Sequence, residues 1–341
     1  ARKNDLREQL AYTANDMTHV YLSAGLPDKA RDTVGEAIAL WRELGIQPML
    51  ADSLATAALL STYSGEYEET VALSDEAFEI SLATKNTWGQ SYSRFAIGFL
   101  YWYRGQPDKA IEAMTECVRL GEEAGFMAAP LYVGSSLALT YAYLGDTDRA
   151  IPLVLRSLGE SRASMPYYEP VALSTYGQVL LLAGRRQEAR AVFEELMTIR
   201  SYLEPLLEAT VEEGMCHYFL TQKEFKSAAR SARNMAGVLR EIDGRLLIPA
   251  AMRLHGQALL GVGQLDQAAA ILAQALSEAQ KMELLWPLWQ IRAALADLAE
   301  ATGDPEQAED HRQQARQIFD TIAGRVPSEE LKVSFTRADY L

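Results

Sequence analysis

A glycine followed five residues later by a small residue recurs at a nearly constant interval along the 341-residue chain. The first instance is AGLPDKA, with Gly25 and Ala30, and the last is TGDPEQA, with Gly303 and Ala308. The eight anchor positions are Gly25, Gly65, Gly105, Gly145, Gly184, Lys223, Gly263 and Gly303, successive anchors being 39 or 40 residues apart. Such an interval predicts an array of similar units, each contacting mainly its neighbours.

Each unit is predicted to be a pair of helices that cross closely. A glycine ends the first helix in the left-handed conformation, which costs least without a Cβ atom. The Asp, Pro, Gln or Glu residues that follow are suited to starting the second helix. The small residue five positions after the anchor is predicted to lie where the two backbones approach. These crossing residues are Ala30, Thr70, Ala110, Ala150, Ala189, Ala228, Ala268 and Ala308.

The first helix of each unit carries a matching small residue. Seven positions before the anchors lie Thr18, Ala58, Gly98, Ala138, Gly177, Cys216, Gly256 and Ala296. Bulky residues such as Tyr21 and Tyr101 lie four positions before the anchor, one turn away. A small residue with bulky neighbours at helical spacing predicts a packed helix–helix contact, and so an all-α fold.

This spacing of small residue, bulky residue, glycine and alanine resembles the tetratricopeptide repeat. The common repeat has 34 residues, so the longer interval implies helices nearly a turn longer, of about 16 residues or 24 Å. The resemblance implies one α-α superhelix (a TPR-like solenoid) over residues 1–341, with about eight helix pairs and a capping helix at 328–338. The expected units are 5–45, 46–85, 86–125, 126–165, 166–204, 205–243, 244–283 and 284–323.

A narrower resemblance comes from the long interval, breaks such as LGI at Leu44–Ile46, and the closing segment IAGRVPSEELKVSF at Ile322–Phe335. These features are similar to the C-terminal repeat regions of bacterial signalling ATPases, including maltotriose-type transcription activators and multidomain adenylate cyclases. The resemblance implies a sensor region whose ATPase, cyclase or DNA-binding domain lies outside these residues. The start at Ala1, without an initiator methionine, fits a segment of a longer protein.

Composition excludes several partners. A formal net charge of -14 disfavours binding to a phosphate backbone, so we expect no direct nucleic-acid contact. No stretch approaches the 18 apolar residues of a membrane span, so we expect no membrane association. Only Cys117 and Cys216 are present, too few for a disulfide framework, which predicts a reducing, cytoplasmic location.

Catalytic and cofactor motifs are not found in the sequence. No Gly-Lys pair occurs, so there is no P-loop. The histidines at 19, 217, 255 and 311 include no pair four residues apart, so no helical metal pair forms. Acidic residues are scattered over helix faces. We therefore predict that the chain is not an enzyme and holds no cofactor or metal.

In the resembled family the first helices line a concave groove, here at positions 13, 10, 6, 3 and 2 before each anchor. The predicted binding residues are Tyr63, Tyr92, Phe95, Phe99, Trp102, Tyr103, Tyr132, Tyr143, His217 and Arg253. One half of this groove is aromatic and the other polar. The aromatic rings either form a binding patch or simply pack between helices of a tightly wound superhelix.

The resulting prediction is a regulatory module that binds a protein or peptide segment, or a small-molecule effector, and belongs to a larger bacterial signal-transduction or transcription-regulating protein. The alternative is a free-standing scaffold or co-chaperone-like adaptor without an effector. The segment SRASMPYYEP, with Pro166 and Pro170, is predicted to alter the packing angle between units four and five.

Overall fold

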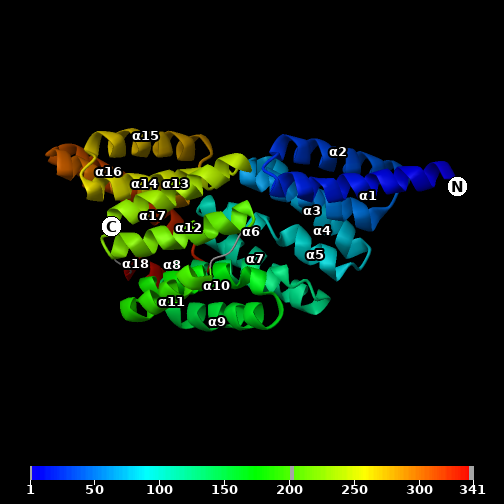
Figure 1. The fold of residues 1–341 in the computed structure, drawn as a ribbon, viewed down its shortest axis with the longest axis horizontal. Coiled ribbons are helices and arrows are strands. Elements are labelled where there is room, and N and C mark those ends of the chain that lie inside the picture. Colours follow the sequence, from blue (N-terminus) through cyan, green and yellow to red (C-terminus); the bar gives the residue numbers. More distant parts are fainter. Residues whose placement is uncertain (1, 200–202, 338–341) are drawn as a thin grey trace.

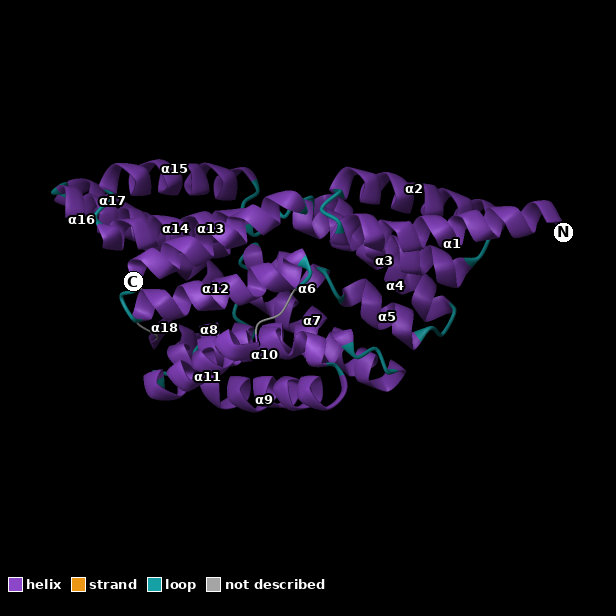
Figure 2. Ribbon diagram, viewed as in Figure 1, coloured by secondary structure: helices purple, strands orange, loops and turns teal. Residues whose placement is uncertain are grey.

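The computed structural model describes residues 2–199 and 203–337, and every regular element within them is helical (Figure 2). The helices form eight successive pairs followed by one short helix. This arrangement confirms the predicted all-α superhelix with a capping helix. The extent of one domain over 1–341 and the predicted unit boundaries stay predictions.

The bounds of the pairs follow the anchors closely. In chain order the pairs are α1 (Arg2–Ser23) with α2 (Pro27–Leu44); α3 (Gln47–Ser64) with α4 (Tyr67–Ala83); α5 (Thr87–Arg94) and α6 (Ile97–Tyr103) with α7 (Pro107–Ala124); η1 (Ala129–Val133) and α8 (Gly134–Tyr143) with α9 (Thr147–Ser164); η2 (Pro166–Tyr168) and α10 (Glu169–Leu182) with α11 (Arg186–Ile199); α12 (Pro205–Thr221) with α13 (Phe225–Glu241); α14 (Ile248–Val262) with α15 (Leu265–Lys281); and α16 (Leu285–Thr302) with α17 (Pro305–Ala323).

The small residues at the helix crossings behave as the sequence predicts. All eight crossing residues, from Ala30 to Ala308, have no exposed surface. At Gly177, seven positions before an anchor, a Cβ atom would lie 2.5 Å from the ring of Phe193. The seven anchor glycines have φ between +67° and +83°, and Lys223 adopts the same left-handed conformation at φ +60°. The pairs therefore depend on close backbone approach at fixed positions.

The first helices of pairs three and four are interrupted. In pair three, α5 and α6 are separated at Phe95 and Ala96, and in pair four the π-helical turn η1 precedes α8. Such turns within helices are frequent at functional sites. Both interruptions lie beside aromatic residues of the predicted groove, Phe95 and Tyr132.

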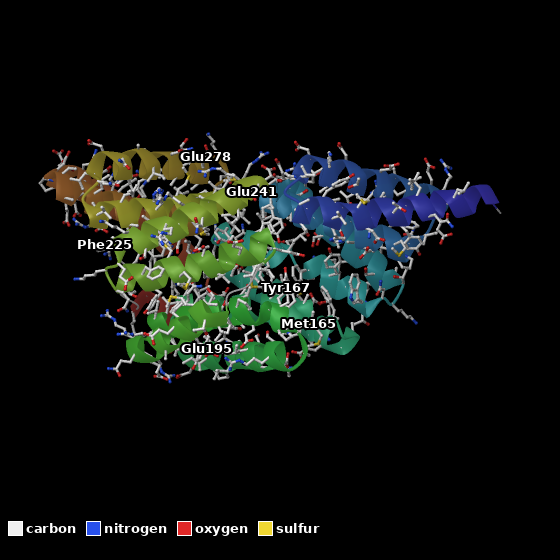
Figure 3. All side chains as sticks on the ribbon, in the orientation of Figure 1. Met165, Tyr167, Glu195, Phe225, Glu241 and Glu278 are labelled. Atoms are coloured by element: carbon white, nitrogen blue, oxygen red, sulfur yellow. The ribbon has the colours of Figure 1, made fainter. Side chains whose placement is uncertain are left out.

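The superhelix turns tightly enough for successive turns to meet. The amino-terminal helices α1 and α2 and the later helices α13 to α16 lie along one edge, and α9 to α11 lie along the opposite edge (Figure 1). Glu241, at the end of α13, lies where the two sets of helices meet, against Gly25 (Figure 3). Pair one therefore contacts pair six directly.

Further contacts repeat this offset of about five pairs along the array. The amide of Leu246, after pair six, donates to the carbonyl of Tyr63 in pair two, with N and O 2.9 Å apart. Arg104 of pair three donates to the carbonyl of Met282 after pair seven, at 3.0 Å. At Gly145 of pair four, a Cβ atom would lie 2.7 Å from the carbonyl oxygen of Ser334 in the capping helix. One turn of the superhelix thus rests on the next.

Asp243, just after α13, connects pair six to pairs one and two. Its carboxylate accepts from Arg31 in pair one, from the Ser64 hydroxyl at 3.1 Å and from Arg245 at 2.7 Å. Burial pushes its pKa upward, but the guanidinium groups of Arg245 and Arg31 hold the pKa below its ordinary value. Asp243 is left-handed at φ +55°, a conformation costing about 1 kcal/mol or more outside glycine.

The capping helix is α18 (Glu329–Arg337). The Ser328 hydroxyl accepts from the Leu331 amide at 3.2 Å, and Leu331 and Phe335 are both buried. The ring of Phe335 stacks on Phe319 of pair eight at a centroid distance of 4.3 Å. The helix thus covers the apolar end of the array, as predicted. Residue 338 of the predicted range lies outside the described residues.

The proline segment between pairs four and five does not loosen the array. Pro170 lies in the first turn of α10, where a missing amide hydrogen costs little, and α10 packs against α9 as α3 packs against α2. The looser junction is the next one, since among the described residues α11 has few contacts with α12. The predicted change of packing angle at Pro166 and Pro170 stays a prediction.

Replacement of Asp243 tests the contact between turns. We expect Asp243→Gly to lower the free energy of unfolding by about 1–3 kcal/mol, because the buried Ser64 hydroxyl and the partly buried Arg31 lose their acceptor. This should hold even though glycine relieves the left-handed backbone. Urea unfolding measures the change.

The control is Lys85→Gly, which replaces an exposed residue of the same conformation, φ +54°, in the turn after α4. It should leave stability unchanged or raise it slightly. An Asp243→Gly variant as stable as Lys85→Gly would show that the turns do not depend on this contact.

Candidate functional site

Two hollows lie on the inner side of the superhelix. The central pocket has a cavity volume of about 90 Å³ and the side pocket one of about 370 Å³. Tyr63, Tyr132 and Leu206 line both, so the two pockets adjoin. The principal lining residues of the central pocket are Phe99, Trp102, Tyr103, Tyr143, Glu213, Arg253 and Trp286, and those of the side pocket are His19, Asp52, Trp88, Tyr92, Phe95, Phe126 and Tyr168.

The central pocket is closed because pair three meets pair eight. The rings of Trp102 on α6 and Trp286 on α16 have centroids 3.9 Å apart, although 184 positions separate them in the sequence. Tyr143 contacts Trp286 from α8 at 5.5 Å. The walls therefore come from distant parts of the chain, and only the superhelical turn brings them together.

A band of aromatic rings continues from the central pocket into the side pocket. The ring of Tyr132 contacts Phe99 and Phe95 at centroid distances of 5.5 and 5.9 Å, and Phe95 also contacts Phe126 at 5.9 Å. Tyr132 is buried, and this burial raises its pKa to about 12. These phenol and phenyl groups stay neutral and give an apolar wall.

The opposite wall is polar. Arg253 on α14 is 5% exposed, and its Nη1 donates to the amide oxygen of Gln257 at 2.7 Å. Glu213 and His217 lie one turn apart on α12, and burial raises the pKa of Glu213. Among the described residues, Nε of Arg253 and Nε2 of His217 are buried without a hydrogen-bond partner. The Arg253 Nε–H group is therefore a donor at the central pocket that the described residues leave without a partner.

The structure gathers nearly all of the predicted site residues. Tyr63, Phe99, Trp102, Tyr103, Tyr132, Tyr143 and Arg253 line the central pocket, and Tyr92 and Phe95 line the side pocket. His217 lines neither pocket; it is partly buried on α12, one turn after Glu213. Most of these rings are buried between helices and also line a pocket. Both interpretations of the aromatic residues, a binding patch and packing between helices, therefore fit the structure. Their role in binding stays a prediction.

Two tryptophans were not predicted. Trp88 and Trp286 each lie 17 positions before an anchor, in the first turn of the first helix of pairs three and eight. Their shared repeat position was a signal in the sequence. The predicted groove positions begin four residues after these tryptophans in each unit and therefore do not include them.

Within residues 2–199 and 203–337, no group of three or more His, Cys, Asp or Glu side chains could hold a metal ion. None of the helices in those ranges combines the length and apolar character needed to cross a bilayer. Both cysteines are buried and free.

Comparison with known proteins agrees with the repeat pattern. A family model of the tetratricopeptide repeat matches residues 170–195, 249–274 and 289–314, and a second model of this repeat matches 91–121. The chain contains tetratricopeptide repeats. These repeats belong to pairs three, five, seven and eight, which include the pairs that meet across the central pocket. No curated protein sequence matches the chain.

Solved structures show the same fold. A Rap conjugation gene regulator of the plasmid pLS20, in complex with the Phr* peptide, has a TM-score of 0.65 at 12% identity, covering 94% of this chain and 98% of that one. NprR in complex with its cognate peptide NprX has a TM-score of 0.55 at 12% identity, covering 98% of each chain.

The signal transduction ATPase PH0952 from Pyrococcus horikoshii, which carries a tetratricopeptide repeat sensor, has a TM-score of 0.47 at 14% identity. The match covers 95% of this chain and 50% of that one. At this score the narrower resemblance to signalling ATPases stays a prediction.

His217 is partly buried with its Nε2 atom fully buried, and this should make stability depend on pH. Burial, with a smaller contribution from Arg253, lowers its pKa to about 3. The unfolded chain binds this proton below about pH 6.5. The stability held by the neutral ring is therefore present at pH 7 and is lost as pH falls toward 3, by roughly 2 kcal/mol at pH 5.

We expect His217→Gln to lose less stability than the wild type between pH 7 and pH 5, as measured by urea unfolding. His19→Gln is the control, because His19 is exposed on α1. An unchanged pH dependence in His217→Gln would show that the native ring takes up a proton freely.

Proposed function

We propose that this chain is a regulatory binding module that takes a short peptide segment, or a small effector of similar size, into the central and side pockets. The observation that carries the proposal is the pairing of an aromatic wall from pairs three and four, completed by Trp286 of pair eight, with a polar wall from pairs six and seven. Pockets that bind ligands are mostly apolar with a few polar groups that fix orientation. The two walls supply these two components.

The peptide class is supported by the proteins of similar fold. Both the Rap regulator and NprR are solved with peptides, and each shares this fold over nearly the whole chain. An extended peptide could run from the side pocket to the central pocket, because Tyr63, Tyr132 and Leu206 border both. Its apolar side chains would contact the rings that line this path.

Binding in the pockets can be passed on through the contacts between turns. A ligand that touches both Trp102 and Trp286 bridges pairs three and eight and so favours the closed superhelix. The effect would reach an attached domain of a signalling or transcription-regulating protein. That attachment rests on the narrower resemblance, and the reading frame upstream of Ala1 tests it.

The proposed role is binding and not catalysis. The polar groups at the pockets are the Arg253 guanidinium, several carboxyls, phenols and hydroxyls, and the His19 imidazole. Among the described residues, no serine, threonine or cysteine that lines a pocket is hydrogen-bonded to a histidine as an activated nucleophile would be. Such groups orient a ligand. A cytoplasmic location follows from the same proposal, since an internal regulator works in a reducing compartment.

Phe99→Ala tests the pocket. Phe99 is partly buried, lines the central pocket and contacts Tyr132. For a peptide selected from a random library by the wild-type chain, we expect its loss to weaken binding at least tenfold, as removal of an aromatic contact does at a binding hot spot. Isothermal titration calorimetry measures the affinity.

The matched control is Phe78→Ala, because Phe78 is also partly buried but lies on α4 under Arg94, outside both pockets. It should bind the peptide as the wild type does. A peptide or protein that binds Phe99→Ala undiminished would contradict the pocket and favour the scaffold alternative, in which partners use the outer surface.

A further inference from the structure

Arg253 is an unusual residue for the wall of a closed pocket. Its side chain is 95% buried, yet no described carboxylate forms an ion pair with it. An isolated buried charge costs several kcal/mol unless it is paired. At the same position of the repeat, the neighbouring pairs have Glu213 or a smaller side chain. Helix packing therefore does not require an arginine at this position.

The neighbours of Arg253 do not neutralise it. Glu213 lies near enough to interact with it electrostatically but makes no ion pair with it, and burial shifts this carboxyl toward its neutral form. Tyr103 and Tyr143 also lie near, and their phenols are uncharged at neutral pH. The central pocket therefore has a positive charge on one wall and indole rings on the other.

The hydrogen bonding of Arg253 leaves one side of its guanidinium available. Nη1 is engaged by Gln257, whereas Nε has no partner among the described residues. Nε and the adjacent Nη2 form an edge that takes both oxygens of a carboxylate. A single guanidinium beside Glu213 suits an anion of one charge better than a phosphate of nearly two.

We propose that Arg253 binds a carboxylate of the ligand in the central pocket, while Trp102 and Trp286 pack against the apolar group beside it. This inference rests on the proposed function and specifies the chemistry of its ligand. A peptide can present the carboxylate either at its C-terminus or on an aspartate or glutamate side chain. Arg253 then determines specificity by rejecting neutral peptides of the same shape.

The test uses three pools of N-acetylated random hexapeptides with the whole chain. The first pool lacks Asp and Glu and ends in a free acid, the second is its C-terminal amide, and the third is the amide with one Asp or Glu. Retained peptides are quantified by mass spectrometry. We expect the wild type to retain the first or the third pool at least about tenfold over the second, and whichever is retained identifies the source of the carboxylate.

Arg253→Gln keeps donors at this position but removes the charge, so we expect it to lose this preference. Arg230→Gln is the control, because Arg230 is exposed on α13 outside both pockets, and it should keep the preference. Equal retention of all three pools, lost only in Phe99→Ala, would overturn the role of Arg253 and leave the proposed function standing. Retention of no pool would contradict both.

The stability of Arg253→Met without peptide gives a second readout. If Arg253 serves a ligand, removing an unpaired buried charge should keep or raise the melting temperature. If instead the bond to Gln257 is structural, the melting temperature should fall by several degrees, and the proposal would be overturned.

Discussion

Close approach of two helices at one small residue per unit is the constraint from which the rest of the structure follows. The crossing residues from Ala30 to Ala308 have no exposed surface, so each pair is held at nearly the same geometry. A small rotation between neighbouring pairs then adds along the array. The array turns so tightly that pairs one, two and three reach pairs six, seven and eight, as the contacts of Asp243, Leu246 and Arg104 show.

The sequence predicted what depends on local spacing. The anchors, the crossing residues and the inward positions of the first helices all follow from a 40-residue interval, because each involves residues of one unit or of neighbours. Lys223 stands where the repeat predicts an anchor glycine, and its backbone is left-handed as at the glycine anchors. The repeat therefore keeps the backbone conformation at this position even without a glycine. The aromatic residues around both pockets could be named for the same reason.

What depends on the superhelical turn could not be predicted. Nothing in the repeat pattern says that Trp102 meets Trp286, because their contact depends on a rotation summed over five pairs. His217 lies at a position of the repeat that was predicted to line the groove, yet it lines neither pocket. Pro170 lies in the first turn of a helix, where proline is accommodated, and the junction after α11, which has few contacts, carries no comparable signal in the sequence.

Joining of successive turns is the central claim, because without it the aromatic and polar walls belong to separate surfaces. The most direct measurement is hydrogen exchange at the amide of Leu246, which lies between α13 and α14 and donates only across the turn, to the carbonyl of Tyr63. If the turns are joined, this amide exchanges as slowly as the amides inside the neighbouring helices. Exchange at the rate of a solvent-exposed loop would show an open array with no closed pocket.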